Sequence, residues 1–315
     1  MRKRDFRKYI AYVKERQHST IADYYIEKDY FLSLFLSTWH SLKKTGKTTH
    51  MNALIFKGGT LLVRNYLRYP RISEDLDFTH NDSNELRRID NANKREQEIK
   101  KRILPILEEI KIVCDAGGFD FDNDRVNTRY VKVRNSRAVY VLQFYYNSLI
   151  TNEEIPIKIE INFLENIMYK CIESRIKTII DMDTFLKSIG YDLENITMKT
   201  YSLEEIIVEK YRAILTRESV KERDVLDLYL IHQRGNNVFK VDSHSILTKI
   251  QSGVIIAPDL KKNLEKNCVL FQNEAFVESN DDISRFTLVN IDNTKYDKFK
   301  SSLHETLKVI CSMQK

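Results

Sequence analysis

The sequence has few of the residues that interrupt regular structure. It contains 8 Gly and 4 Pro in 315 residues, so long flexible linkers are not expected. It also has no apolar stretch near the roughly 20 residues that span a bilayer. The longest one, around 30–39, is interrupted by Ser and Thr. The basic N-terminus leads into a periodic, mixed segment and not into an apolar signal core. We therefore expect no association with a membrane.

Cysteine and histidine give no sign of a metal or disulfide framework. The 4 cysteines are scattered along the chain, and their spacing is typical neither of a zinc site nor of paired bridges. A reducing cytoplasm is the simplest location for such a chain. The net charge of +6 is compatible with a polyanionic partner such as RNA, but ordinary surface lysines explain it equally well.

Hydrophobic periodicity predicts alternating helices and strands in the first part of the chain. Pro70 is expected to end one of these helices. The predicted elements are helices at 5–17 and 20–44, a buried strand at 54–56, a helix at 61–69, a strand at 72–79 and a long helix at 84–114.

The later part predicts further strands and then a mainly helical region. One or two antiparallel strands are expected within 119–147 and another at 155–163. Helices follow at 202–217 and 222–233, and the tail after 235 combines a turn at 252–253, a polar stretch near 279–282 and a closing helix. This order indicates an α+β fold with a mixed sheet. We divide the chain into N-terminal helices (1–45), a core (46–164) and a C-terminal mainly helical domain (165–315).

Two aspartates on the predicted strand 72–79 are candidates for binding metal. On a strand, Asp75 and Asp77 project from the same face, about 6–7 Å apart, while Leu76 and Phe78 point into a core. Aspartate is disfavoured in strands, and the two charges repel unless a cation lies between them. Two Mg²⁺ ions, or Mn²⁺ in their place, would bridge such carboxylates. An exposed edge strand would explain an isolated pair, so the interpretation depends on the neighbouring residues.

A glycine pair precedes the two aspartates. Gly58 and Gly59 follow a predicted strand and precede a predicted helix, so their amides and the helix N-terminus can form an anion site. Thr60 adds a hydroxyl donor or a helix cap. The spacing matches neither a P-loop nor a dinucleotide-binding fingerprint. A phosphate-binding turn beside an acidic strand is the combination that nucleotide transfer from a triphosphate requires.

A third carboxylate is available on the predicted strand 155–163. Glu160 shares one face of that strand with Lys158 and Asn162. Two-metal phosphoryl chemistry commonly uses a carboxylate from a neighbouring strand, so we assign Glu160 to the metal site. A solvated strand face is the alternative.

A second group of charged residues lies on the helices 202–217 and 222–233. Lys210 falls within the apolar stripe of the first helix, and a buried ammonium group needs a partner. A triphosphate or the carboxylate cluster would provide one. On the second helix, Asp224 and Asp227 share a face with apolar residues, and Arg217 and Arg223 are available for pairing or for phosphate.

Basic residues gather between 125 and 137, where the sequence has no acidic residue and is followed by tyrosines. Basic and aromatic side chains on strands suit a nucleic-acid backbone and stacked bases, although a solvated sheet face is an equal alternative. The residues that we assign to nucleic-acid binding are Arg129, Lys132, Arg134 and Arg137.

Four motifs together resemble the AbiEii/AbiGii family. Its members are nucleotidyltransferase toxins of bacterial and archaeal abortive-infection and toxin–antitoxin systems, related to the DNA polymerase β superfamily. The resemblance covers roughly residues 20–233. The motifs are Ile26-Glu27-Lys28-Asp29-Tyr30, Phe56-Lys57-Gly58-Gly59-Thr60, Arg71-Ile72-Ser73-Glu74-Asp75-Leu76-Asp77 and Lys210-Tyr211-Arg212-Ala213 with Arg223-Asp224 and Asp227-Leu228.

The resemblance implies a polymerase β-like core and a toxin that transfers NMP from an NTP to RNA. Related toxins add nucleotides to tRNA 3′ ends, and a neighbouring antitoxin protein is the implied partner. The C-terminal domain is expected to complete the active site. The resulting assignments are Lys57, Gly58, Gly59, Thr60, Ser73 and Lys210 for the nucleotide, Asp75, Asp77 and Glu160 for metal, and these three with Lys210 and Asp224 for catalysis.

Three other functions are compatible with parts of this pattern. One is NMP transfer to a protein side chain. Another is a metal-dependent nuclease, although such enzymes usually have Glu-x-Lys on one strand and this chain has Lys158-x-Glu160. The third is a non-catalytic RNA-binding module on a decayed transferase fold, against which the intact carboxylate set argues.

Overall fold

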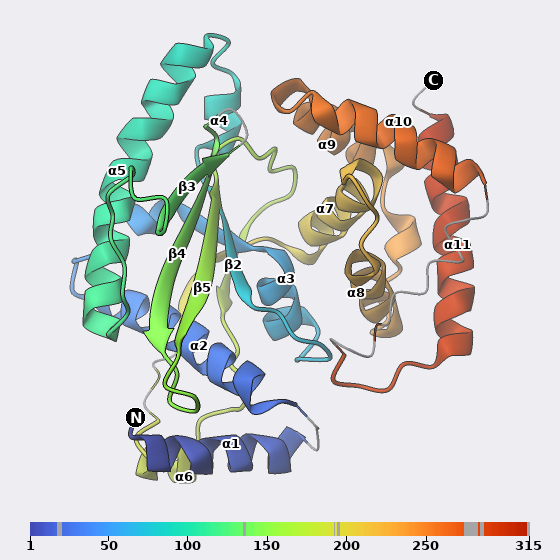
Figure 1. Cartoon of the computed structure of the whole chain (residues 1–315). Coiled ribbons are helices and arrows are strands. Elements are labelled where there is room, and N and C mark those ends of the chain that lie inside the picture. The colour runs from blue at the N-terminus through green and yellow to red at the C-terminus, as the bar shows by residue number, and fades with distance from the viewer. Residues whose placement is uncertain are drawn as a thin grey trace. The chain divides into compact units, whose positions relative to one another are not determined.

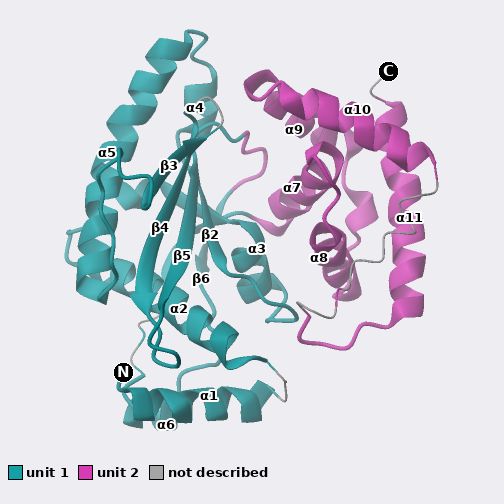
Figure 2. Ribbon diagram, viewed as in Figure 1, with its two compact units in different colours: residues 1–165, 171–201 teal, residues 166–170, 202–315 magenta. Residues whose placement is uncertain are grey.

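The computed structural model describes residues 1–17, 21–134, 137–191, 193, 196–273, 283 and 287–313. The chain forms two compact units (Figures 1 and 2). Unit 1 comprises residues 1–165 and 171–201, and unit 2 comprises residues 166–170 and 202–315. The described residues contain no helix that is both long and apolar enough to cross a membrane.

Unit 1 is built on a seven-stranded mixed sheet in the order β3-β4-β5-β2-β1-β7-β6. The neighbours β1 and β2 are antiparallel, whereas β2 pairs with β5, and β1 with β7, in parallel. This sheet confirms the predicted α+β class. The strands are β1 (Leu54–Lys57), β2 (Asp75–His80), β3 (Val131–Arg134), β4 (Val139–Asn147), β5 (Glu154–Asn162), β6 (Ile172–Arg175) and β7 (Thr197–Thr200).

Helices cover the apolar face of this sheet. Figure 1 shows α2 crossing behind the strands. Its Phe35 ring stacks on Phe144 of β4 at 4.7 Å between centroids, and its Trp39 ring lies 5.7 Å from Phe78 of β2. Burial of such large rings stabilises the layer strongly. The helical elements of unit 1 are α1 (Lys3–Gln17), α2 (Asp23–Lys44), η1 (His50–Ala53), α3 (Gly58–Leu61), η2 (Leu62–Tyr66), α4 (Ser83–Arg87), α5 (Ala92–Gly117) and α6 (Thr184–Ser188).

Several predicted boundaries are wrong for local reasons. The helix predicted at 61–69 begins at Gly58 and ends as a π-helical turn at Tyr66. The helix predicted at 84–114 is two helices, because Asn91 accepts a hydrogen bond from the Lys94 amide and starts a new one. The short strands β6 and β7 were not predicted. The β6 side chains are mostly exposed, so no hydrophobic alternation marks that strand.

Unit 2 is helical among its described residues. The turn predicted at 252–253 is wrong, since both residues lie inside α9, and the polar stretch at 279–282 falls outside the described residues. The predicted closing helix is confirmed as α11. The elements are α7 (Leu203–Thr216), α8 (Glu222–Gln233), η3 (Val238–Lys240), α9 (Ser243–Ile256), α10 (Asp259–Gln272) and α11 (Asn293–Ser312).

A disulfide joins two helices of unit 2. Cys268 on α10 and Cys311 on α11 are bonded, with a separation of 43 residues along the chain. The expectation of unpaired cysteines is therefore wrong for these two. Sequence spacing could not reveal the pair because helix packing, and not a local motif, brings the two sulfurs together.

A buried ion cluster explains why residues 166–170 belong to unit 2. Glu205 of α7 accepts hydrogen bonds from the Met168 and Tyr169 amides at 2.9 and 2.7 Å. Lys249 of α9 contacts the Glu205 and Glu209 carboxylates, and both the Lys249 and Glu205 side chains are 0% exposed. The loop is thus held by polar groups that would be costly to bury unpaired.

Candidate active site

One row of charged residues crosses the polar face of the unit 1 sheet. The strand register places Lys57 of β1 opposite Asp77 of β2, and Asp77 opposite Glu160 of β5. Residues directly opposite on neighbouring strands project from the same face, with strands about 4.8 Å apart. Asp75 pairs with Lys158 one step along the same face. The tertiary structure thus brings Lys57, Asp75, Asp77 and Glu160 together.

Within this row, the pKa of Asp77 is shifted by its surroundings. Burial raises its pKa, and the Glu160 and Asp75 carboxylates add to the effect, against the opposing Lys57 and Lys158 ammonium groups; the resulting pKa is about 6. Lys158 bridges the other two acids, with its Nζ 3.3 Å from Asp75 Oδ2 and 3.8 Å from Glu160 Oε2. A cluster of acids with too few cations is a favourable place for a metal ion.

Gly58 lies directly against the Asp77 carboxylate. Its φ is +78°, and a Cβ at this position would fall 2.1 Å from Asp77 Oδ2. Only glycine satisfies both the left-handed backbone and this close approach. The predicted glycine turn and the predicted acidic strand are therefore in contact.

We expect Gly58→Ala to lower nucleotidyl transfer at least about a hundredfold, because the new methyl group displaces the Asp77 carboxylate. The left-handed backbone should also cost about 1–2 kcal/mol of stability. Gly46→Ala is a matched control, since Gly46 has φ +72° but nothing within 4 Å of its Cβ position. Transfer activity and urea unfolding of both variants test this. Equal activity of the two variants would contradict it.

Thr60 and Ser73 link the turn to the start of the acidic strand. Thr60 is buried, and its hydroxyl lies 2.9 Å from Ser73 Oγ and also contacts the Asp75 carbonyl. The N-cap of α3 is Lys57 and not Thr60. Thr60 thus fixes the backbone that carries Asp75, and its predicted contact with phosphate stays a prediction.

Lys57 is oriented by a residue that sequence reasoning missed. Glu165 Oε2 accepts hydrogen bonds from Lys57 Nζ at 2.8 Å and from Asn162 Nδ2 at 3.0 Å. No motif in the sequence marks Glu165, because the contact joins residues 108 positions apart. Glu165 offsets the Lys57 charge, and so fewer positive charges remain for Asp77.

The charged group predicted on two helices is assembled within unit 2. Lys210 Nζ lies 2.8 Å from Asp224 Oδ1 and 2.6 Å from Asp227 Oδ2. Arg217 Nη1 contacts Asp224 Oδ2 at 2.5 Å, whereas Arg223 is exposed. The buried lysine therefore has two carboxylate partners on the next helix. Its role with a nucleotide, and that of Asp224 in catalysis, stay predictions.

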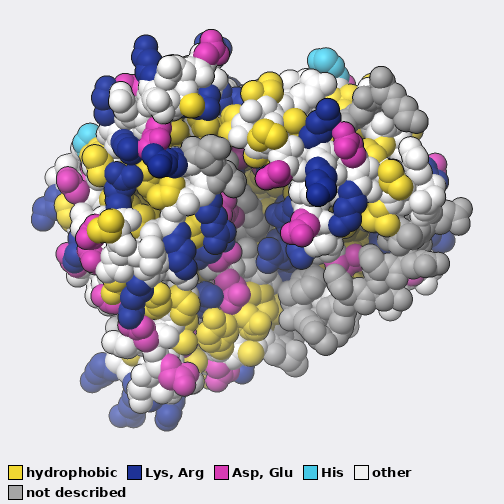
Figure 3. Space-filling model, turned by 45° about the horizontal axis from the view of Figure 1, so that its top comes forward, with side chains coloured by type: hydrophobic (Ala, Val, Ile, Leu, Met, Phe, Trp, Pro, Cys, Tyr) yellow, Lys and Arg dark blue, Asp and Glu magenta, His cyan; other side chains and the backbone are white. Residues whose placement is uncertain are grey.

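The four predicted nucleic-acid residues have different surroundings. Arg129 pairs with Glu154 at 2.6 Å, and Arg137 with Glu96 at 2.5 Å. Lys132 and Arg134 are exposed on β3, and the register places them on the same face as Glu160. Figure 3 shows Lys and Arg side chains interspersed with Asp and Glu on the face it presents. Of these four residues, only Lys132 and Arg134 form no ion pair with another described residue.

The donor chemistry of the acidic row fits magnesium. Among the described residues, no group of three or more His, Cys, Asp or Glu side chains is arranged so that it could hold a metal ion by itself. Mg²⁺, however, is usually held by one or two carboxylates together with substrate phosphates and water. Asp75 and Asp77 supply such oxygens, and burial together with the neighbouring Glu160 and Asp75 carboxylates raises the pKa of Asp77.

Comparison with known proteins identifies the family. The model of the nucleotidyl transferase AbiEii toxin of type IV toxin–antitoxin systems matches residues 42–292. The chain belongs to this AbiEii family. This confirms the resemblance seen in the sequence motifs, and it makes the chain a nucleotidyltransferase of a toxin–antitoxin family, for which an NTP is the substrate and an antitoxin the cognate partner.

Two solved structures are similar to this AbiEii protein at low identity. A candidate nucleotidyltransferase from H. pylori is 15% identical with a TM-score of 0.41, over 93% of this chain and 97% of that chain. JHP933 from Helicobacter pylori is 16% identical with a TM-score of 0.38, over 87% and 93% of the respective chains. A comparison with curated proteins finds no match. The identification rests on the family match.

Proposed function

We propose that this AbiEii protein transfers NMP from an NTP to an acceptor hydroxyl on RNA, at the 3′ end of a tRNA, with Mg²⁺ as cofactor. The observation that carries the proposal is the register of β1, β2 and β5, which places Lys57, Asp77 and Glu160 in one row beside Gly58. A glycine turn whose amides can donate to phosphate and carboxylate oxygens that can bind a cation occur there together.

Each residue of the row has a distinct task in this proposal. Asp75, Asp77 and Glu160 would provide the oxygen ligands for the metal, which when bound would lower the pKa of the acceptor hydroxyl and polarise the phosphate. The amides of Gly58 and Gly59 would donate hydrogen bonds to the triphosphate at close range. Preorganised charges of this kind are usually the largest contribution to phosphoryl transfer. Lys210 is proposed to offset charge in the same reaction, which Lys210→Met tests by its activity.

RNA is the favoured acceptor because Lys132 and Arg134 lie exposed on the face that carries the acids. Three strand spacings, about 14 Å, separate β3 from β2. This distance is suitable for contacts of Lys132 and Arg134 with the backbone of an RNA chain bound at the acidic row. The cytoplasm, where NTPs and tRNA occur, is the proposed location.

Sequencing of RNA 3′ ends after incubation with each NTP and Mg²⁺ tests the proposal directly. Added nucleotides that require both components support it. Label from α-phosphate-labelled NTP that enters protein and not RNA would favour transfer to a side chain instead. RNA cleavage without NTP would favour a nuclease, and binding of RNA with no NTP-dependent product would favour a non-catalytic module.

In the metal-free protein, Asp77→Asn is expected to raise stability near pH 7. The pKa of Asp77 is about 6 in the folded chain, above its unfolded value of about 4. The folded state therefore binds the proton more tightly, and stability falls as the pH rises from about 4 through about 6. Because the side chain is only half-buried and water screens it, we expect a gain of about 1–2 kcal/mol.

Urea unfolding in EDTA across this pH range measures the effect. The difference between wild type and Asp77→Asn should vanish below about pH 4, where both states are protonated. Asp90→Asn, which changes an exposed carboxylate, should leave the pH dependence unchanged. A constant difference between wild type and Asp77→Asn at all pH values would show that Asp77 does not have a raised pKa.

A further inference from the structure

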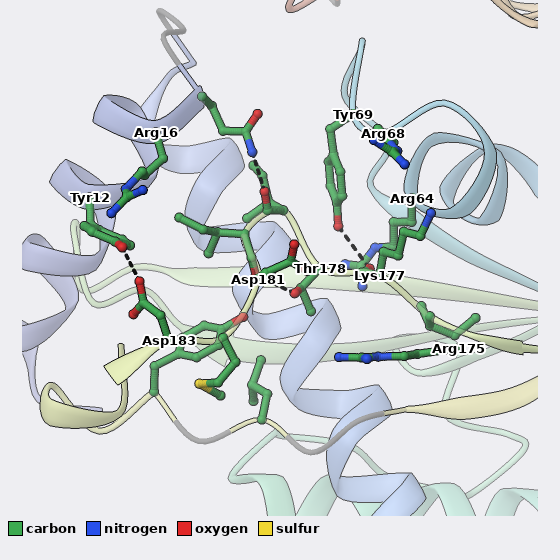
Figure 4. A pocket seen from close by; sticks show the side chains of 17 residues that line it. Tyr12, Arg16, Arg64, Arg68, Tyr69, Arg175, Lys177, Thr178, Asp181 and Asp183 are labelled. Carbon is green, nitrogen blue, oxygen red and sulfur yellow. Dashed lines mark hydrogen bonds between the residues drawn. The ribbon is translucent and has the colours of Figure 1, made fainter. Parts of the chain in front are cut away.

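A cavity of about 700 Å³ lies within unit 1, away from the acidic row. It is lined by the end of α1, by residues at and after η2, and by the segment from β6 to α6 (Figure 4). Its volume is in the range of small-molecule sites. None of Asp75, Asp77 and Glu160 lines it.

Strand register separates this cavity from the acidic row. Thr200 of β7 pairs with Phe56, the neighbour of Lys57, whereas Arg175, which lines the cavity, pairs with Thr197. The three residues from Thr200 to Thr197 correspond to about 10 Å along the strand. The wall of the cavity that Arg175 forms therefore lies toward the ends of these strands that are opposite to the end carrying Lys57.

Basic side chains gather on one side of the cavity. Figure 4 shows Arg64, Arg68, Arg175 and Lys177 on the same side as Tyr69, Arg16 and Asp183 on the other side with Tyr12, and Asp181 between the two sides. Asp183 is already engaged, because it accepts a hydrogen bond from Tyr12 and caps α6. In the described part of the chain, Lys177 Nζ has one hydrogen-bond acceptor, the Asn65 carbonyl at 3.3 Å. Arg68 and Arg175 have no ion pair with any described residue.

Arg64 is a fully buried guanidinium at the base of this basic side, with 0% of its side chain exposed. Its Nη2 lies 2.7 Å from Asp29 Oδ1, while its Nε and Nη1 have no hydrogen-bond partner among the described residues. Buried donors without an acceptor are rare and costly. The unmet donors point to an acceptor that none of the described residues supplies.

The backbone beside this side is strained. Arg68 and Tyr69 both have left-handed conformations, with φ of 53° and 57°, and neither is glycine. Each such residue costs about 1–3 kcal/mol and occurs mainly where function requires it. Here the strain directs two successive side chains, one cationic and one aromatic, toward the cavity.

We propose that this cavity binds a nucleoside phosphate, as a free nucleotide or as a nucleotide of single-stranded RNA. Arg68, Arg175 and Lys177 would bind the phosphate oxygens as charge-assisted donors. Arg64 neutralises Asp29, and Asp181 and Asp183 are the acidic residues of the lining, so the five basic residues leave a net positive charge for the ligand. The Tyr69 ring offers a surface for the base. The proposal does not depend on the function proposed for the acidic row.

Binding of two probes tests this proposal: ATP and a short single-stranded oligoadenylate, each with EDTA so that metal-dependent binding at the acidic row is suppressed. Titration compares wild type with Arg68→Ala/Arg175→Ala. The matched control Arg88→Ala/Lys94→Ala removes the same charge at exposed positions outside the cavity. The cavity variant should bind at least about tenfold more weakly, and the control should stay within about twofold of wild type.

If the cavity variant binds only ATP more weakly, the ligand is a free nucleotide. If it binds the oligoadenylate more weakly, the ligand is a nucleotide of RNA. Equal weakening in both variants, or no binding of either probe to wild type, overturns the proposal. Hydrogen exchange of wild type gives a measurement that needs no variant. Each probe that binds should protect 64–69 and 175–179, and absence of that protection would also overturn the proposal. Transfer activity is measured separately, so failure here leaves the acidic row untouched.

Discussion

Asp77→Asn is expected to lower nucleotidyl transfer on the order of a thousandfold or more. Asp77 lies at the centre of the row, opposite both Lys57 and Glu160 and directly against Gly58. Asparagine keeps the shape but removes the charge that would hold a metal ion. The measurement is incorporation of label from α-phosphate-labelled NTP into RNA at saturating Mg²⁺.

The control for this prediction is Asp90→Asn, which should keep wild-type activity because Asp90 is exposed and lies outside the row. Because Asp77→Asn is expected to increase stability, a loss of activity in this variant would not result from unfolding. A group that weakens the fold while supporting a reaction is typical of a functional site. Undiminished labelling by Asp77→Asn would exclude the row as the catalytic centre.

Lys249→Met is expected to destabilise the protein by about 3–5 kcal/mol. The Lys249 ammonium is fully buried, contacts Glu205 and Glu209, and also donates to the Asn166 carbonyl. Methionine retains much of the volume but takes the cation away from the fully buried Glu205 carboxylate, while Glu209 keeps its pairing with Arg212 at 2.9 Å. Unfolding should begin in unit 2, and hydrogen exchange at 166–170 should report the loss of the loop contacts.

The double variant Glu205→Gln/Lys249→Met removes the charge on both sides and should recover part of this loss. Lys240→Ala, at an exposed position in the same unit, should change stability by no more than about 0.5 kcal/mol. If Lys249→Met had the same urea midpoint of unfolding as wild type, the buried cluster would not contribute substantially to the stability of unit 2.

The sequence alone predicted the local parts of the candidate site well. Strand alternation put Asp75 and Asp77 on one face, and the register confirms that Glu160 shares that face. The apolar stripe around Lys210 indicated a buried lysine that needs a partner, and Asp224 and Asp227 provide one. These inferences succeeded because each depends on a period of two or of 3.6 residues, which a sequence displays directly.

Contacts between distant residues were not predictable in this way. Glu165, which orients Lys57, and the Cys268–Cys311 bond both join positions far apart in the chain. The strand β6 escaped detection because its side chains are mostly exposed, and β7 because its alternation covers only 4 residues. They nevertheless carry Arg175, and with it one wall of the basic cavity.

The sequence by itself determined the two-faced strands, the glycine turn before the acids, the charged helical pair and the family. The tertiary structure alone decided that Gly58 touches Asp77, that Lys249 is buried between two glutamates, and that the fully buried Arg64 lines one cavity with four other cations. The physical reason is that side-chain direction follows from local backbone geometry, whereas burial and charge pairing depend on which distant segments pack together.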